Sequence, residues 1–341
     1  MGIKDYLKHI DQEIPQLKSR EYDYVYMDSN YMIHYLIYKC KKDTDLYSKL
    51  FDYWDYLMSV IKIKKQIYLI FDGEYDTDNA LENPKYQTHL LRSKQKIASD
   101  EYDKQSIYPG SKILKTFREF FVDIIERYKK INRSNIEIII NGDDVKGEAD
   151  TKILNTIYNS NQDNICICSK DSDMILIGHS LCMNKIIHID ILSNLRPIKF
   201  INIEQFKKYD KDYVLMVLLL GNDYLPKISN IKYNNLIEYY DKFIKFNKSI
   251  IIEDKINYHN LVEYITYIII NSNKKKIKLN LNNINPSRFE IYINNLDWCL
   301  KYYKVIKNNK NYIQELTHST DEIKLKNVIN IYNFIPYNYT D

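Results

Sequence analysis

The stretch Tyr24-Val25-Tyr26-Met27-Asp28-Ser29 decides the fold, because an apolar run ends there on an acidic residue just before a helical pattern begins. Further strand-like runs follow at 66–71, 136–140, 165–168 and 185–189. Helical patterns lie near 29–40, 45–62, 110–130, 149–159 and 210–220. Strands and helices that alternate in this way form parallel sheets. We therefore predict an α/β fold with a central, largely parallel sheet flanked by helices.

After Pro226 the pattern becomes helical and largely polar. We therefore predict two parts, an α/β core over residues 1–228 and a mainly helical C-terminal part over residues 229–341 that packs on the core. The chain has 341 residues and a formal charge of +4. Such a mild charge permits a polyanionic partner without requiring one.

Neither a membrane protein nor a secreted one is indicated. The N-terminus lacks the apolar segment of a signal peptide, and the longest apolar run, 214–220, is too short to cross a bilayer. The five cysteines are odd in number and form no CxxC pair, so we expect buried thiols rather than disulfides or a zinc site. We expect an intracellular, cytoplasmic protein in a reducing compartment, acting as a monomer.

Acidic residues stand where predicted strands end or helices begin. They are Asp28, Asp72, Glu148, Asp150, Asp171, Asp173 and Asp223. Each residue alone would be explained as a helix cap. Together, at the shared carboxyl edge of a parallel sheet, seven carboxylates would repel one another without bound cations. Carboxylate and water are the ligands that Mg²⁺ and Mn²⁺ prefer, so we predict two such ions. Two ions about 4 Å apart can promote the hydrolysis of a phosphodiester.

The same motifs resemble the Xrn family of 5′→3′ exoribonucleases, part of the wider superfamily that includes the flap endonucleases. The similar segments run nearly end to end, at 1–3, 28–34, 71–73, 147–150, 169–173, 221–226, 298–303 and 336–339. The resemblance implies a PIN/flap-nuclease-like core and a metal-dependent enzyme that degrades single-stranded RNA with a 5′-monophosphate to mononucleotides. It also implies that the seven acidic residues are catalytic metal ligands.

The resemblance further implies a site for the 5′ end of the RNA. His34 would stack on a base, and Arg92, Lys94 and Lys96 would bind the terminal phosphate. An ordinary core or surface histidine and a solvated helix face are the alternative interpretations. The chain also departs from the family pattern. Gln87 stands where the family has a lysine, and Asp150 replaces a glutamate.

Two other functions stay open. A structure-specific 5′ flap or DNA nuclease would share the acidic site. However, residues 227–235 lack the glycines of the helix-turn-helix with which flap endonucleases grip duplex DNA. A catalytically inactive, RNA-binding relative would have lost metal ligands, whereas all seven positions are acidic.

Overall fold

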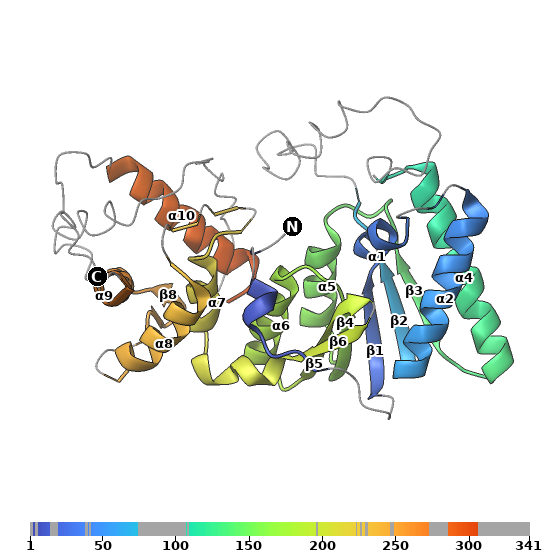
Figure 1. The fold of residues 1–341 in the computed structure, drawn as a ribbon, viewed down its shortest axis with the longest axis horizontal. Coiled ribbons are helices and arrows are strands. Elements are labelled where there is room, and N and C mark those ends of the chain that lie inside the picture. Colours follow the sequence, from blue (N-terminus) through green and yellow to red (C-terminus); the bar gives the residue numbers. More distant parts are fainter. Residues whose placement is uncertain are drawn as a thin grey trace. The chain divides into compact units, whose positions relative to one another are not determined.

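The computed structural model describes residues 3, 6–13, 20–37, 40, 42–73, 107, 109–195, 197–222, 224–225, 227–228, 231–245, 249–272 and 286–305. The chain divides into two units (Figure 1). Asp11–Lys207 forms the sheet unit, whereas Met1–Ile10 and Lys208–Asp341 together form the helical unit. Within the described residues, no helix is both long and apolar enough to cross a membrane.

The sheet unit is built on six strands, and the order across the sheet is β3-β2-β1-β4-β5-β6. The strands are β1 (Arg20–Asp28), β2 (Ile61–Ile70), β3 (Glu137–Asn141), β4 (Asn164–Cys168), β5 (His188–Leu195) and β6 (Ile198–Asn202). The first five run parallel, and β6 is antiparallel to β5. The predicted parallel α/β sheet is therefore confirmed. The strand order reverses between β1 and β4, the position where open sheets of this kind bind ligands.

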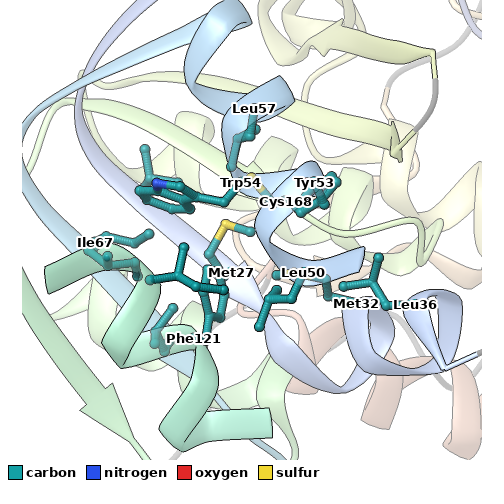
Figure 2. Packing of buried hydrophobic residues seen from close by; sticks show 14 of the residues in the cluster. Met27, Met32, Leu36, Leu50, Tyr53, Trp54, Leu57, Ile67, Phe121 and Cys168 are labelled. Atoms are coloured by element: carbon teal, nitrogen blue, oxygen red, sulfur yellow. The ribbon is translucent and has the colours of Figure 1, made fainter. Parts of the chain in front are cut away.

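Helices cover both faces of the sheet. Side chains alternate along a strand, so successive residues of β1 point to opposite faces. Val25 and Met27 join a core formed with α1 (Ser29–Leu36), α2 (Asp43–Val60) and α4 (Lys112–Asn132), as Figure 2 shows around Met27 and Trp54. On the other face, Tyr26 stacks on Tyr68, and the packed helices are α5 (Ala149–Tyr158) and α6 (Asp173–Asn184).

Several predicted boundaries were wrong. The helix predicted over 45–62 ends at Val60, and β2 begins at once, because Ile61 and Ile63 are buried while Lys62 is exposed. This alternation is typical of a strand. Helix α6 was missed because residues 174–182 are mostly apolar and are buried on all sides, which leaves no amphipathic period. The antiparallel strand β6 was missed as well. The expectation of buried thiols is confirmed, since all five cysteines are free and buried.

The helical unit comprises η1 (Tyr6–His9), the hairpin β7 (Ile251–Ile252) and β8 (Lys255–Ile256), and the helices α7 (Asp212–Leu218), α8 (Tyr233–Phe243), α9 (Tyr258–Ser272) and α10 (Pro286–Tyr302). A 3-10 helix, η4 (Ile203–Tyr209), follows β6 in the chain. Tyr6 belongs to this unit because its hydroxyl lies 2.6 Å from that of Tyr213. The division between the two units lies between residues 207 and 208. The predicted boundary at 228, with a helical part that packs on the core, stays a prediction.

Candidate active site

The acidic edge is the name we use for six of the predicted site residues, which lie where parallel strands of the sheet unit end or where the following helix begins. They are Asp28, Asp72, Glu148, Asp150, Asp171 and Asp173. The seventh acidic residue, Asp223, lies outside the described residues, as do Gln87 and the predicted phosphate ligands Arg92, Lys94 and Lys96.

Asp28 occupies the centre of the acidic edge, at the end of β1. It caps α1, because its Oδ1 accepts a hydrogen bond of 3.0 Å from the backbone N–H of Tyr31. Its other oxygen, Oδ2, accepts a hydrogen bond of 2.8 Å from the hydroxyl of Ser169, which directly follows β4. The carboxylate thus spans the place where the strand order reverses. Asp28 can therefore be both a helix cap and a site residue, because Oδ1 caps the helix while Oδ2 faces Ser169.

Ser169 connects Asp28 to the loop after β4. Its hydroxyl is fully buried, and it also accepts a hydrogen bond of 3.1 Å from the backbone N–H of Asp171. Oδ1 of Asp171 in turn accepts from the backbone N–H of Asp173, at 3.1 Å, where α6 begins. A continuous chain of hydrogen bonds therefore positions Asp28 and Asp171 relative to each other.

Asp72 follows β2 and caps a different helix. Its Oδ1 accepts a hydrogen bond of 2.7 Å from the N–H of Ala149, the first residue of α5. A carboxylate at this place is stabilised by the positive end of the helix dipole. The backbone N–H of Asp72 donates to Oδ1 of Asn30 at 3.0 Å, which ties the end of β2 to α1.

Two glycines allow the turns beside these carboxylates. Gly73 donates its N–H to the carbonyl of Gly147 at 2.9 Å, and a Cβ atom at Gly73 would stand 1.7 Å from the carbonyl oxygen of Val145. Gly147 has φ +101°, a conformation that side chains disfavour. The turn delivers Glu148 to the N-cap of α5 and Asp150 to its first turn, where Oδ1 of Asp150 accepts from the N–H of Thr151 at 2.6 Å.

Charge accumulates at this edge. The pKa of Asp28 is raised to about 7, first by burial and then by the neighbouring carboxylates of Asp72 and Asp171, although the hydrogen bonds from Tyr31 and Ser169 oppose this increase. Like charges this close favour the neutral acid or a bound cation. The donors fit hard divalent ions chemically. Within the described chain, however, no three His, Cys, Asp or Glu residues form a metal-binding group, so the ligand set stays a prediction.

His34 occupies the last turn of α1 and is partly exposed. Its helix begins at Asp28, so the side chain belongs to an element that the acidic edge anchors. The stacking role predicted for His34 stays a prediction.

Three supporting residues were missed from the sequence. Asn30 and Ser169 lie inside the quoted motifs, but short polar residues next to an acidic one are common in turns. The third, Lys152, is buried at 6% exposure on the face of α5 that also carries Ala149 and Ile153. A lysine at an apolar position of a helix was the signal that could have identified it.

The profile described as "XRN 5'-3' exonuclease N-terminus" matches residues 1–76 and 74–194. The 5′-3′ exoribonuclease 1 of Saccharomyces cerevisiae is 23% identical in an alignment 305 positions long, gaps included, that covers 69% of this chain and 20% of the relative. The 5′-3′ exoribonuclease 2 of Arabidopsis thaliana is 21% identical in an alignment 363 positions long, gaps included, that covers 75% of this chain and 35% of the relative. The matched part is thus at most about a third of these relatives' length.

Two solved structures are also similar. The catalytic core of Rad2 in complex with a DNA substrate gives a TM-score of 0.45 at 15% identity, with 94% of this chain and 88% of that chain covered. Flap endonuclease-1 from Methanococcus jannaschii gives 0.36 at 14% identity, with 89% of this chain and 99% of that chain covered. Both TM-scores are below 0.5.

Proposed function

The chain belongs to the XRN 5′-3′ exonuclease N-terminus family, and from this premise we propose that it is a metal-dependent 5′→3′ exoribonuclease. Its substrate would be single-stranded RNA with a 5′-monophosphate, released as mononucleotides. The observation that carries the proposal is the hydrogen-bonded acidic edge, where Asp72 and Asp171 lie close enough to Asp28 to raise its pKa. These residues belong to the part of the chain that the family profile matches.

The acidic residues would hold two Mg²⁺ or Mn²⁺ ions. The ligands would come from Asp28, Asp72, Glu148, Asp150, Asp171, Asp173 and Asp223. Bound ions would supply an activated water and neutralise charge on the phosphodiester. The protein itself would hold the metal ligands in place. Ser169 orients Asp28 and Asp171, and the start of α5 orients Asp72.

The 5′ end of the RNA would be bound next to these ligands. Arg92, Lys94 and Lys96 would donate charge-assisted hydrogen bonds to the terminal phosphate, and His34 would stack on the first base. We further propose that the enzyme works as a cytoplasmic monomer. The five free, buried cysteines suit a reducing compartment.

Two substitutions at opposite ends of the same strand, β4, test the proposal. Asp171→Ala, beyond the carboxyl end of β4, should reduce RNA hydrolysis in Mg²⁺ by at least about 100-fold. Asp163→Ala provides the matched control, because this exposed carboxylate precedes the amino end of β4, where its Oδ1 accepts a hydrogen bond from the N–H of the next residue. Unchanged hydrolysis by Asp171→Ala, with circular dichroism confirming that both variants fold, would refute the metal-site proposal.

The substrate is tested by following products over time. RNA of one sequence is supplied with a 5′-phosphate, a 5′-hydroxyl or a cap, and a flapped DNA is added as a fourth substrate. Mononucleotides from the 5′-phosphorylated RNA alone are expected. Cleavage of flapped DNA in preference to RNA would support the flap nuclease instead. RNA binding without hydrolysis of any substrate would support an inactive relative.

A further inference from the structure

Lys152 is a buried cation that the proposed reaction leaves without a role. It lies in the first turn of α5 and is 6% exposed. Its Nζ donates to the carbonyl oxygen of Phe71 at 2.8 Å and to that of Gly142 at 3.0 Å. These carbonyls directly follow β2 and β3, so the ammonium group joins the ends of two strands at the acidic edge. Buried lysines are rare unless their charge is compensated.

The backbone next to Asp72 leaves room for this ammonium group. A Cβ atom at Gly73 would lie 3.1 Å from Nζ of Lys152, so the glycine lets the cation lie directly against the chain beside Asp72. The carboxylate of Asp72 is itself held at the start of α5, where it accepts from Ala149. Lys152 and Asp72 are therefore both held at the same short turn.

Lys152 is surrounded by negative charge. Burial lowers its pKa, whereas the carboxylates of Asp72, Asp144 and Asp143, in decreasing order of effect, oppose that decrease. Asp143 already has a cation of its own, since Nη1 of Arg118 lies 3.3 Å from its Oδ1. Nζ of Lys152 therefore lies beside Asp72, against Phe71 on one side of it and Gly73 on the other, and Asp72 is the acid that opposes the decrease in the pKa of Lys152 most.

We propose that Lys152 is the internal counter-cation of the acidic edge, a positioning residue whose ammonium group lies against the backbone on both sides of Asp72 and holds that carboxylate in place when no metal is bound. A divalent ion would then share this neutralising role with Lys152. Only the statement about the ion rests on the proposed function. The coupling between Lys152 and Asp72 is a property of the metal-free protein, and it can be tested separately.

A double-substitution cycle on the full chain in EDTA tests the coupling. Lys152→Met keeps the length of the side chain and removes the charge, and Asp72→Asn keeps an oxygen that can accept from Ala149. We expect Lys152→Met to lower Tm by about 5 °C in the native background. In the Asp72→Asn background, the decrease in Tm should be less than half as large, because the attraction between Lys152 and the carboxylate of Asp72 has already been removed.

Lys185→Met is the matched control for the cycle. Lys185 also donates to two backbone carbonyls, those of Ile157 and Ser160, and burial is the sole cause that lowers its pKa. Its substitution should therefore lower Tm equally in both backgrounds. If Lys152→Met also lowers Tm equally in both backgrounds, Lys152 only ties backbone carbonyls and the counter-cation proposal is wrong.

Mg²⁺ provides the second measurement. Excess Mg²⁺ should raise the Tm of Lys152→Met more than that of the native chain, because the ion replaces the missing charge, while Lys185→Met should match the native chain. If the native Tm does not respond to Mg²⁺, the proposed metal site fails, and the cycle in EDTA still tests the counter-cation.

A Lys152→Met chain that does not fold is informative as well. If Asp72→Asn restores folding of the double variant, the proposal is supported, because removing one charge has corrected the loss of the other. If the double variant stays unfolded while Asp72→Asn alone folds, the proposal is overturned.

Discussion

At the scale of the residue, Ser169 shows how one hydroxyl can position two acidic groups. It donates to Oδ2 of Asp28 at 2.8 Å and accepts from the N–H of Asp171 at 3.1 Å, away from solvent. Bonds to charged groups are stronger than those between neutral groups. The hydroxyl also opposes the increase in the pKa of Asp28 that burial causes.

Ser169→Ala should therefore lower the free energy of unfolding of the metal-free protein by about 1–2 kcal/mol, because a carboxylate oxygen and an N–H group lose their buried partner. RNA hydrolysis should fall by about 10-fold or more, since the two proposed ligands are no longer oriented. Urea unfolding and product assays measure the two effects.

Ser180→Ala is a suitable control for Ser169→Ala. Ser180 is equally buried, on α6, and its hydroxyl has no hydrogen-bond partner among the described residues. Removing that hydroxyl should leave stability within about 0.5 kcal/mol of the native value, or raise it slightly. Equal losses in the two variants would show that the bonds of Ser169 do not matter.

The acidic positions could be predicted from the sequence because strand ends are marked by a change from apolar to polar residues. Their partners could not. Asp28 and Ser169 are separated by 141 positions, and only the finished sheet places β1 beside β4. Lys152 gives no motif at all, because its role depends on the absence of a side chain at Gly73, in a different element. The ligand set and the residues for the 5′ end stay predictions.

At the scale of the element, a polar cluster joins β1 to β5 across the strand between them. Oδ2 of Asp190 accepts from Nη1 of Arg20 at 2.9 Å and from the hydroxyl of Tyr22 at 2.6 Å, and Nε2 of His188 lies 3.5 Å away. Burial alone would raise the pKa of Asp190, but His188, Tyr22 and Arg20 together lower it. The hydrogen bond to Asp190 raises the pKa of His188 despite partial burial.

The stability of the protein should therefore decline on both sides of a pH window. The raised pKa of His188 stabilises the fold below its unfolded value of about 6.5, and this contribution is lost as pH rises through the folded pKa. The lowered pKa of Asp190 stabilises the fold above about 3.9, and this contribution is lost as pH falls through the folded pKa. Urea unfolding over a pH series measures both.

His188→Gln isolates the upper limit of that window. The variant should lose the decline above about pH 6.5 and keep a smaller acid decline, because Tyr22 and Arg20 still lower the pKa of Asp190. The effect should stay below about 1 kcal/mol, because the side chain is 41% exposed and water screens the pair. His259→Gln, on α9, is the control and should keep the native profile. An unchanged slope in His188→Gln would contradict the assignment.

A helix or strand could be predicted from the sequence where its own residues show a clear buried face. Helix α4 was predicted because Ser111 caps it and Phe117, Phe121 and Ile124 recur at helical spacing on one buried face. Strand β6 was missed because its pairing with β5 turns the chain back, against the parallel pattern. A single sequence gives no sign of that reversal, which depends on the neighbouring strand.

At the scale of the whole molecule, the first residues of the chain belong with its second half. Tyr6 is fully buried, its hydroxyl lies 2.6 Å from that of Tyr213, and its ring lies 5.4 Å from that of Tyr233. The helical unit is therefore incomplete until the segment of Tyr6 and the segment of Tyr213 and Tyr233 have both been synthesised.

Tyr6→Ala should destabilise the helical unit by about 3–5 kcal/mol, the usual cost of removing a buried aromatic side chain. Hydrogen exchange followed by mass spectrometry should show faster exchange in α7 and α8, with β1 to β5 unchanged. Tyr22→Ala is the matched comparison, because that buried tyrosine lies in the sheet unit and should affect β1 and β5 instead. Equal acceleration throughout the chain in Tyr6→Ala would contradict the division into units.

The strand order has a consequence for how the protein is made. The ribosome produces β1, β2 and β3 first, and β4 must then be added beside β1, on the side away from β2. Until that late step, Asp28 and Asp72 exist in a nascent chain without Ser169, Asp171 or Asp173. Because synthesis is far slower than the formation of local structure, a partly made chain spends seconds in this state. An incomplete translation product therefore lacks the assembled acidic edge, and an RNA molecule near the ribosome would not meet a functional site.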